Sequence, residues 1–197
     1  MGVVSLSSNF TAARHPMALK ATIFKANLQI ADMDRHYYAS HALTIARHPS
    51  ETDERMMVRL LAFACHAHEH LAFARGLSEA DEPDAWQKDL TGAIERWIDV
   101  GLPDEKRILK ACGRANQVAI YAYGGRAATL WWNAIGPKLT RLKNVTVINV
   151  QPAVTQALAQ LAQRSMQLGC TIQDGAVWLN SDTESVQAAF DVLREPA

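Results

Sequence analysis

The sequence predicts a mixed domain of the α/β or α+β class, in which a mixed central β-sheet is flanked by helices. Strand-like and helix-like segments alternate through the middle of the chain, and hairpin-like strand pairs stand at both ends. Apolar residues make up 49% of the 197 residues, which is enough to form a buried core. This length predicts a single domain over residues 17–197, preceded by a polar, weakly patterned extension, residues 1–16, that we expect to be disordered.

The first part of the chain predicts a strand pair followed by a long helix. Segments 20–30 and 37–47 are rich in Thr, Ile, Phe and Tyr and flank a turn, which indicates an antiparallel hairpin. Pro49 and Ser50 then introduce apolar residues at helical spacing. We therefore expect a helix with Ser50 as its N-cap that ends before Gly76.

The rest of the chain predicts alternating elements of both kinds. Strands are expected at DAWQKDL, AIERWIDVG, QVAIYAYG and NVTVINV. Helices are expected from Pro103 to about Arg114, at RAATLWWNAI and at PAVTQALAQLAQRSMQL. CTIQ and AVWLN predict a hairpin around Asp174-Gly175, and VQAAFDVL fits a strand or a helix, with a strand preferred.

Charge and cysteine usage narrow the expected partners and the compartment. The formal net charge is zero, which argues against an extended basic coat for nucleic acid and gives no sign of a membrane partner. No stretch approaches the roughly 20 apolar residues that a membrane-spanning helix needs. The three cysteines stand far apart in apolar contexts, so we expect buried thiols in a reducing cytoplasm.

Two local motifs leave alternatives open. His66, Glu69 and His70 form an HxxEH string, which on a helix can hold zinc, although no third ligand is apparent and a solvent-facing cluster would look the same. The glycine pair in YGGRA can be an anion-binding turn or a plain tight turn. Signatures of P-loop, dinucleotide-binding and serine-hydrolase sites are absent from the sequence.

Two aspartates stand at the ends of neighbouring predicted strands. Asp84 begins one strand and Asp99 ends the next, and antiparallel pairing would bring them to one edge of the sheet. Glu54, on the apolar side of the long helix, could complete the set. Carboxylates that converge in this way suit Mg²⁺ or Mn²⁺, whose bound water can attack a phosphodiester. The alternative is an ordinary strand pair with charged ends.

The helix after Pro103 carries four cations on one face, at spacings of three, four and seven residues: Lys106, Arg107, Lys110 and Arg114. A phosphate backbone could lie on this face, which makes nucleic acid a candidate partner. The alternative is a solvated helix face without a ligand.

Several long strings resemble the YaeQ family: ARHPSETDERMM, DEPDAW, IDVGLPDEKRILKAC, RAATLWW and TIQDG. The resemblance runs from about Met17 to the C-terminus. It implies a variant of the PD-(D/E)XK nuclease fold, and it supplies a candidate site rather than a substrate.

Mapped by motif, the resemblance implies that Pro83-Asp84 is the first element and that Asp99-Val100-Gly101 is the second. Asp84, Asp99 and Glu54 would then be the ligands of Mg²⁺ or Mn²⁺. Gly101 stands where the motif has its lysine, so this sequence departs from the pattern at a catalytic position.

The resemblance also implies that the following helix can supply the missing lysine. Lys110 is the first candidate for this role and Arg107 is the second. Glu54, or alternatively Glu51, would be the acid carried by the long helix, and Ser50 lies close by in the sequence.

Two functional hypotheses follow. The first is a nuclease or phosphodiesterase that depends on a divalent metal, in which Lys110 orients water or stabilises charge. The second is a nuclease-like fold without catalysis that binds nucleic acid or a protein partner. The zero net charge and Gly101 favour the second hypothesis.

Overall fold

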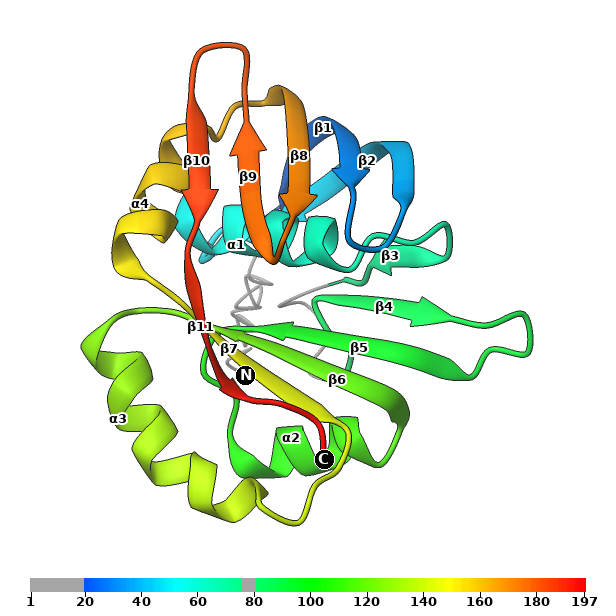
Figure 1. Cartoon of the computed structure of the whole chain (residues 1–197), viewed down its shortest axis with the longest axis vertical. Helices are drawn as coiled ribbons and strands as arrows, with labels where there is room; N and C mark the ends of the chain where they lie inside the picture. The colour runs from blue at the N-terminus through cyan, green and yellow to red at the C-terminus, as the bar shows by residue number, and fades with distance from the viewer. Residues whose placement is uncertain (1–19, 76–80) are drawn as a thin grey trace, which may run out of the picture.

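Two mixed β-sheets and the helices packed on them make up the described part of the chain, residues 20–75 and 81–197 of a computed structural model (Figure 1). The predicted mixed α/β class is confirmed. The strands are divided over two sheets, whereas the sequence predicted one central sheet. The extension expected at residues 1–16 lies outside the described residues.

The first sheet has five strands in the order β10-β9-β8-β1-β2. Only β1 and β8 pair in parallel, and the other neighbours are antiparallel. Buried and exposed residues alternate along β1, because successive side chains of a strand point to opposite faces. The strands are β1 Thr22–Asp32, β2 Tyr37–Arg47, β8 Ser165–Gln173, β9 Ala176–Asn180 and β10 Ser185–Ala188.

The second sheet has six strands in the order β11-β7-β6-β5-β4-β3. The central strands β5, β6 and β7 are parallel, and the outer pairings are antiparallel. The two strands expected at DAWQKDL and AIERWIDVG are confirmed as β4 and β5, and they pair antiparallel. The strands are β3 Leu71–Phe73, β4 Ala85–Lys88, β5 Ile94–Val100, β6 Ala115–Ala122, β7 Val145–Val150 and β11 Phe190–Arg194.

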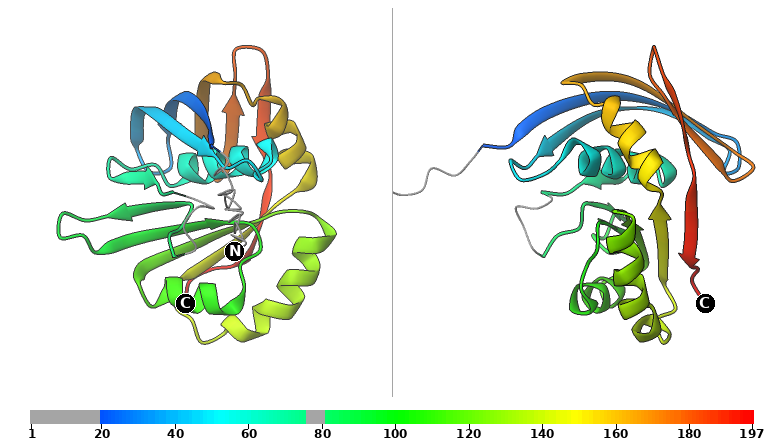
Figure 2. Two further views of the ribbon diagram at one scale, coloured as in Figure 1. Left: turned by 180° about the vertical axis from the view of Figure 1, so that it is seen from behind. Right: turned by 90° about the vertical axis from the view of Figure 1, so that its left-hand side faces the viewer.

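The helices occupy two layers. α1 (Asp53–Cys65) and α4 (Pro152–Gln160) lie between the sheets, and the first sheet curves over them (Figure 2). The other face of the second sheet is covered by α2 (Glu105–Cys112) and α3 (Arg126–Ile135) (Figure 1). A short 3-10 helix, Gly136–Leu139, follows α3.

Each face of the second sheet has its own apolar core. Helix α1 is buried from Met56 to Ala64, because it packs against β1 and β2 on one side and against Ile98 and Val100 of β5 on the other. A second cluster joins Trp97 of β5 to α2, α3, β6 and β7. Neighbouring residues of β5 therefore serve different cores, which explains why the end of this strand is buried on both faces.

The helix expected to start at Ser50 and to end before Gly76 is shorter than predicted. Thr52 is its N-cap, with a side chain that accepts a hydrogen bond from the Arg55 N–H, and the helix ends at Cys65. The chain then turns, and β3 pairs with β4. Apolar spacing alone could not distinguish this strand from a further helical turn. Gly76 lies outside the described residues.

Two expectations near the C-terminus also need correction. The helix predicted for PAVTQALAQLAQRSMQL ends at Gln160, and Ser165 begins β8, in which Met166 and Leu168 are buried at a spacing of two. The segment VQAAFDVL is extended as preferred, but it splits into β10 and β11, which belong to different sheets (Figure 2). No helix in residues 20–75 or 81–197 is long and apolar enough to cross a membrane.

Candidate functional site

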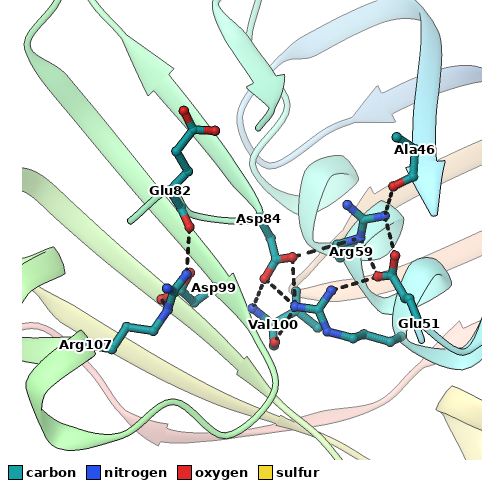
Figure 3. Close-up of polar contacts among 9 residues, drawn as sticks. Ala46, Glu51, Arg59, Glu82, Asp84, Asp99, Val100 and Arg107 are labelled. Carbon is teal, nitrogen blue, oxygen red and sulfur yellow. Dashed lines mark hydrogen bonds and ion pairs between the residues drawn. The ribbon is translucent and has the colours of Figure 1, made fainter. Parts of the chain in front are cut away.

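Asp84 stands directly before β4 and contacts both α1 and β5. Its two carboxylate oxygens each lie 2.9 Å from Arg55 Nη2, and Oδ2 also accepts from the Val100 N–H at 2.7 Å. The same Arg55 nitrogen donates to the Val100 carbonyl oxygen at 3.1 Å. Asp84 therefore ties the start of β4 to the end of β5 and to the first turn of α1 (Figure 3).

Glu51 joins a second arginine of α1 to the same group. Its Oε1 lies 2.7 Å from Arg55 Nη1 and 2.9 Å from Arg59 Nε, and its Oε2 accepts from Arg59 Nη2 at 2.9 Å. Arg59 Nε also lies 4.0 Å from Asp84 Oδ1. We call Glu51, Arg55, Arg59 and Asp84 the α1 ion cluster.

The α1 ion cluster is enclosed by protein. The side chains of Glu51 and Arg59 expose only 1% and 2% of their surface. Burial opposes the charge of Arg55, but the charges of Asp84 and Glu51 outweigh it and raise the pKa of Arg55. For Arg59 burial dominates and lowers the pKa. The two acids and two cations balance, as a buried ionic group requires.

Asp99, near the end of β5, is bound by helix α2. Arg107 donates to its carboxylate from Nε at 2.8 Å and from Nη2 at 2.7 Å, and Nη2 also donates to the Glu82 carbonyl oxygen at 2.8 Å. Burial raises the pKa of Asp99, although its hydrogen bond with Arg107 acts in the opposite direction. Burial also opposes the Arg107 cation, but Asp99 outweighs this and raises the pKa of Arg107.

The two predicted aspartates do come to adjacent ends of β4 and β5. The Asp84 N–H donates to the Ile98 carbonyl oxygen at 2.9 Å, which sets Asp84 beside Asp99 in the hairpin. Their carboxylates nevertheless turn to different cations, Arg55 on α1 and Arg107 on α2 (Figure 3). The hairpin end thus carries two ion-paired carboxylates with separate partners.

Three further predicted site residues, Glu54, Lys110 and Ser50, contact partners other than Asp84 and Asp99. Glu54 accepts a hydrogen bond from the Thr155 hydroxyl of α4, and Lys110 pairs with Asp81. The Ser50 hydroxyl lies 2.6 Å from His48 Nδ1 at the surface. Of the two acids proposed for the helix, Glu51 is the one that shares Arg55 with Asp84.

Gly101 follows β5 in a conformation that explains why no lysine stands there. Its φ is +115°, which L side chains rarely adopt, although a Cβ at this position would meet no atom within 4 Å. Its N–H donates to the Tyr121 carbonyl oxygen at 2.9 Å, which fixes this turn of the chain beside β6. A lysine would be strained by the backbone rather than by crowding.

The carboxylates do not fit a divalent cation in this arrangement. Mg²⁺ and Mn²⁺ favour several carboxylates that converge on one cation, whereas Asp84 and Asp99 each accept hydrogen bonds at both oxygens from a different arginine. A cation bound at either carboxylate would lie close to a guanidinium group, and the two positive charges would repel each other. Within the described ranges, no group of three or more His, Cys, Asp or Glu side chains is placed to hold a metal ion.

The zinc interpretation of HxxEH is wrong, because residues 66–70 do not form a helix. His66 caps the end of α1, with Nε2 3.1 Å from the Tyr121 hydroxyl and Nδ1 beside Arg96. His70 is exposed and lies 3.6 Å from Glu69. The two histidines therefore have different surroundings and do not share a ligand position.

Arg55 and Arg59 were missed by the sequence analysis, although they organise the site. The signal was present as spacing, because Glu51, Arg55 and Arg59 stand four residues apart. Such spacing places an acid and two cations on one side of a helix.

The fold and the site together define a mixed α/β protein in which arginines neutralise the acids of a buried hairpin end. A family model described as YaeQ protein matches residues 17–190, and the chain belongs to the YaeQ family. The resemblance noted in the sequence is thereby confirmed.

Relatives and solved structures agree with this membership. The proteins called "Uncharacterized protein YaeQ" from Salmonella typhi and Escherichia coli K12 are 46% and 44% identical over 181 residues, which span 92% of this chain and 100% of each relative. The crystal structure of YaeQ protein from Xanthomonas axonopodis pv. citri has a TM-score of 0.86 at 49% sequence identity. The match covers 89% of this chain and 99% of the Xanthomonas chain. The crystal structure of YaeQ protein from Pseudomonas syringae has a TM-score of 0.85 at 38% sequence identity. The match covers 89% of this chain and 97% of the Pseudomonas chain.

Proposed function

We propose that this chain is a binding protein without a metal-dependent catalytic centre, in which Asp84 and Asp99 hold the β4–β5 hairpin to α1 and α2. One observation carries the proposal: each aspartate accepts hydrogen bonds at both carboxylate oxygens from an arginine of a neighbouring helix. Those oxygens are the ones that a hard divalent cation would need.

A protein partner suits the surface better than nucleic acid. The cations of α2 are largely occupied, since Arg107 binds Asp99 and Lys110 pairs with Asp81. Arg114 donates to the Asp81 carbonyl oxygen and lies over the Trp97 ring at 5.5 Å. With a net charge of zero, little positive potential remains for a phosphate backbone.

The groove between α2 and α3 supplies a surface with the chemistry of a protein interface. Its volume is about 630 Å³, and its apolar lining includes Leu102, Leu109, Trp131 and Ile135. Leu102 and Leu109 are 38% and 47% exposed. Charged side chains also line the groove: Asp104, Glu105, Lys106 and Lys138. Exposed apolar side chains together with charged ones are typical of protein interfaces, so the expected occupant is a protein segment with apolar side chains.

Cleavage assays test the absence of catalysis. Double-stranded DNA, single-stranded DNA, RNA and an activated phosphodiester are incubated with the protein and Mn²⁺ or Mg²⁺, beside Asp84→Asn and Asp99→Asn. We expect no metal-dependent cleavage above that of the two variants. Cleavage by the wild type that both variants lose would contradict the proposal.

Site-specific photocrosslinking in cells tests the groove. A photoreactive amino acid at Leu109 is compared with one at Leu90, which is 94% exposed and does not line the groove. We expect a defined protein adduct from position 109 that is lost when Leu102→Asp is added. Adducts with nucleic acid, or the same products from both positions, would contradict a protein partner.

A metal-dependent phosphodiesterase is the second candidate, and one observation favours it. Glu51, Asp84 and Asp99 are buried acids close to the end of β5, where the resemblance places metal ligands. A metal ion bound there would lie close to Arg55 and Arg107, whose charges oppose it. The same cleavage assay separates the two candidates.

A further inference from the structure

Arg96 is the one cation of β5, and it lies on the face of the sheet that packs against α1. It contacts two neutral acceptors: the ring of His66 at Nδ1, and Gln117 Oε1, which lies 2.5 Å from Nη2. Its Nε is buried and has no hydrogen-bond partner. The guanidinium is therefore fixed in place, yet part of its donor capacity is unused.

No carboxylate of the described residues forms an ion pair with Arg96, in contrast to Arg55 and Arg59. Burial lowers the pKa of Arg96, and the nearby charge of Arg35 lowers it further. A half-buried cation without a counter-ion is unfavourable, and an anion beside it would remove the cost.

A cavity of about 340 Å³ opens beside this guanidinium. Lys143 is the second cation in its wall, and the described residues that line it include no Asp or Glu. Amide side chains complete much of the polar lining: Asn116, Gln117 and Asn144. Two cations and three amides in the lining are the chemistry of a site for a small polar anion, with Glu95 held outside the lining by a hydrogen bond of 3.0 Å from Asn116.

His66 holds Arg96 toward the cavity. Burial, with the charges of Arg96 and Arg35, lowers the pKa of His66 to about 3, so the ring is neutral near pH 7. A neutral ring that accepts from Arg96 at Nδ1 carries its proton on Nε2, and it donates to the Tyr121 hydroxyl at 3.1 Å. His66 is thus a positioning residue for Arg96.

We propose that this cavity binds a small oxyanion, a molecule that carries a carboxylate or phosphate group, with Arg96 and Lys143 as its charged contacts. The volume suits a small metabolite and is too small for a folded peptide or an oligonucleotide. The cavity is separate from Asp84 and Asp99, neither of which lines it. This assignment does not depend on the proposed function.

Thermal unfolding of the full chain tests the site, with inorganic phosphate and acetate as probes and sodium chloride at equal ionic strength as the reference. Arg96→Gln and Lys143→Gln remove the charged contacts, and Lys138→Gln is the matched control outside the cavity. At a saturating concentration of the preferred anion we expect the wild-type midpoint to rise by ~3 °C. A response to phosphate alone indicates a phosphate group, and a response to acetate indicates a carboxylate.

Both charge-removing variants should lose this response, and Lys138→Gln should keep it. Equal shifts in all four proteins would mean a general salt effect and would overturn the proposal, as would no shift in the wild type. A two-dimensional NMR titration of the wild type provides a readout that needs no variant. The side-chain amide signals of Gln117 and Asn144 should move with saturation, and unchanged signals would also overturn the proposal.

Discussion

Arg107 donates two parallel hydrogen bonds to Asp99, from Nε to Oδ2 at 2.8 Å and from Nη2 to Oδ1 at 2.7 Å. This two-point geometry is the strongest form of arginine–carboxylate pairing. It places a helix-borne cation on the aspartate that a nuclease motif would assign to a metal. Arg55 contacts both carboxylate oxygens of Asp84 through the single nitrogen Nη2, so both helices that flank the hairpin contribute a guanidinium.

Breaking the α1 ion cluster should destabilise the protein. Asp84→Asn leaves Arg55 and Arg59 partly uncompensated in a buried setting, so we expect a loss of ~3 kcal/mol in the free energy of unfolding. Urea unfolding measures the loss. Arg55→Met should be similarly harmful alone, and the double variant should lose less than the sum of the two.

The exposed pair of Lys138 and Glu105 is the control for this cycle. Its side chains are 55% and 41% exposed, so Glu105→Gln should cost less than ~1 kcal/mol. A gain of stability in Asp84→Asn would indicate crowded acids of a catalytic centre and would count against the ion-pair account.

Placing a side chain at position 101 should be unfavourable. Gly101→Ala must hold a φ of +115°, so we expect a loss of ~1–3 kcal/mol in urea unfolding. Gly169→Ala is the matched control, because a Cβ there also meets nothing within 4 Å but the backbone has no positive φ. Equal effects at both positions would show that backbone strain is not the reason for Gly101.

The start of α1 offers a sharp test of the helix boundary. Thr52→Ala removes the side chain that accepts from the Arg55 N–H at 3.1 Å, so it should cost ~1 kcal/mol. Ser50→Ala removes only a surface contact with His48 and should cost less than ~0.5 kcal/mol. A larger effect at Ser50 than at Thr52 would restore the boundary that the sequence predicted.

Stability should fall at acidic pH because of His66. Its pKa is lowered from 6.5 to about 3, so below pH 6.5 the unfolded chain binds a proton that the folded protein takes up only near pH 3. The contribution of the neutral His66 ring to the free energy of unfolding is complete above pH 6.5. It is lost as the pH falls toward 3, at ~1 kcal/mol per pH unit. Urea unfolding at several pH values measures this slope. His66→Gln should have a shallower slope, and an unchanged slope would contradict the assignment.

Much of the fold was predictable because its signals are local. The β1–β2 and β4–β5 hairpins follow from strand-forming segments around turns, and α2 follows from Pro103 and the acids after it. The division into two sheets was not predictable, because it depends on β8 pairing in parallel with β1, more than 130 residues away. Long-range pairing of this kind leaves no periodic trace in the sequence.

The adjacency of Asp84 and Asp99 was predictable from the sequence, whereas their arginine partners were not. Asp84 and Asp99 come to one hairpin end as their place in the strands indicated. The choice between Glu51 and Glu54 depended on where α1 begins. Because the helix starts at Asp53, Glu54 turns to Thr155 of α4, and Glu51 precedes the helix and reaches the arginines. The contacts of each side chain in the folded protein therefore determined that Glu51 has arginine counter-ions and that Glu54 is hydrogen-bonded to a hydroxyl group.

The central claim is that the motif carboxylates serve ion pairs rather than a metal. Its most direct test is the free energy of unfolding of the wild type and of Asp99→Asn, each with and without millimolar Mn²⁺. We predict that Mn²⁺ leaves the wild type unchanged and that Asp99→Asn is less stable in both conditions. Stabilisation of the wild type by Mn²⁺, together with a variant that is more stable without metal and no longer responds to it, would contradict the account.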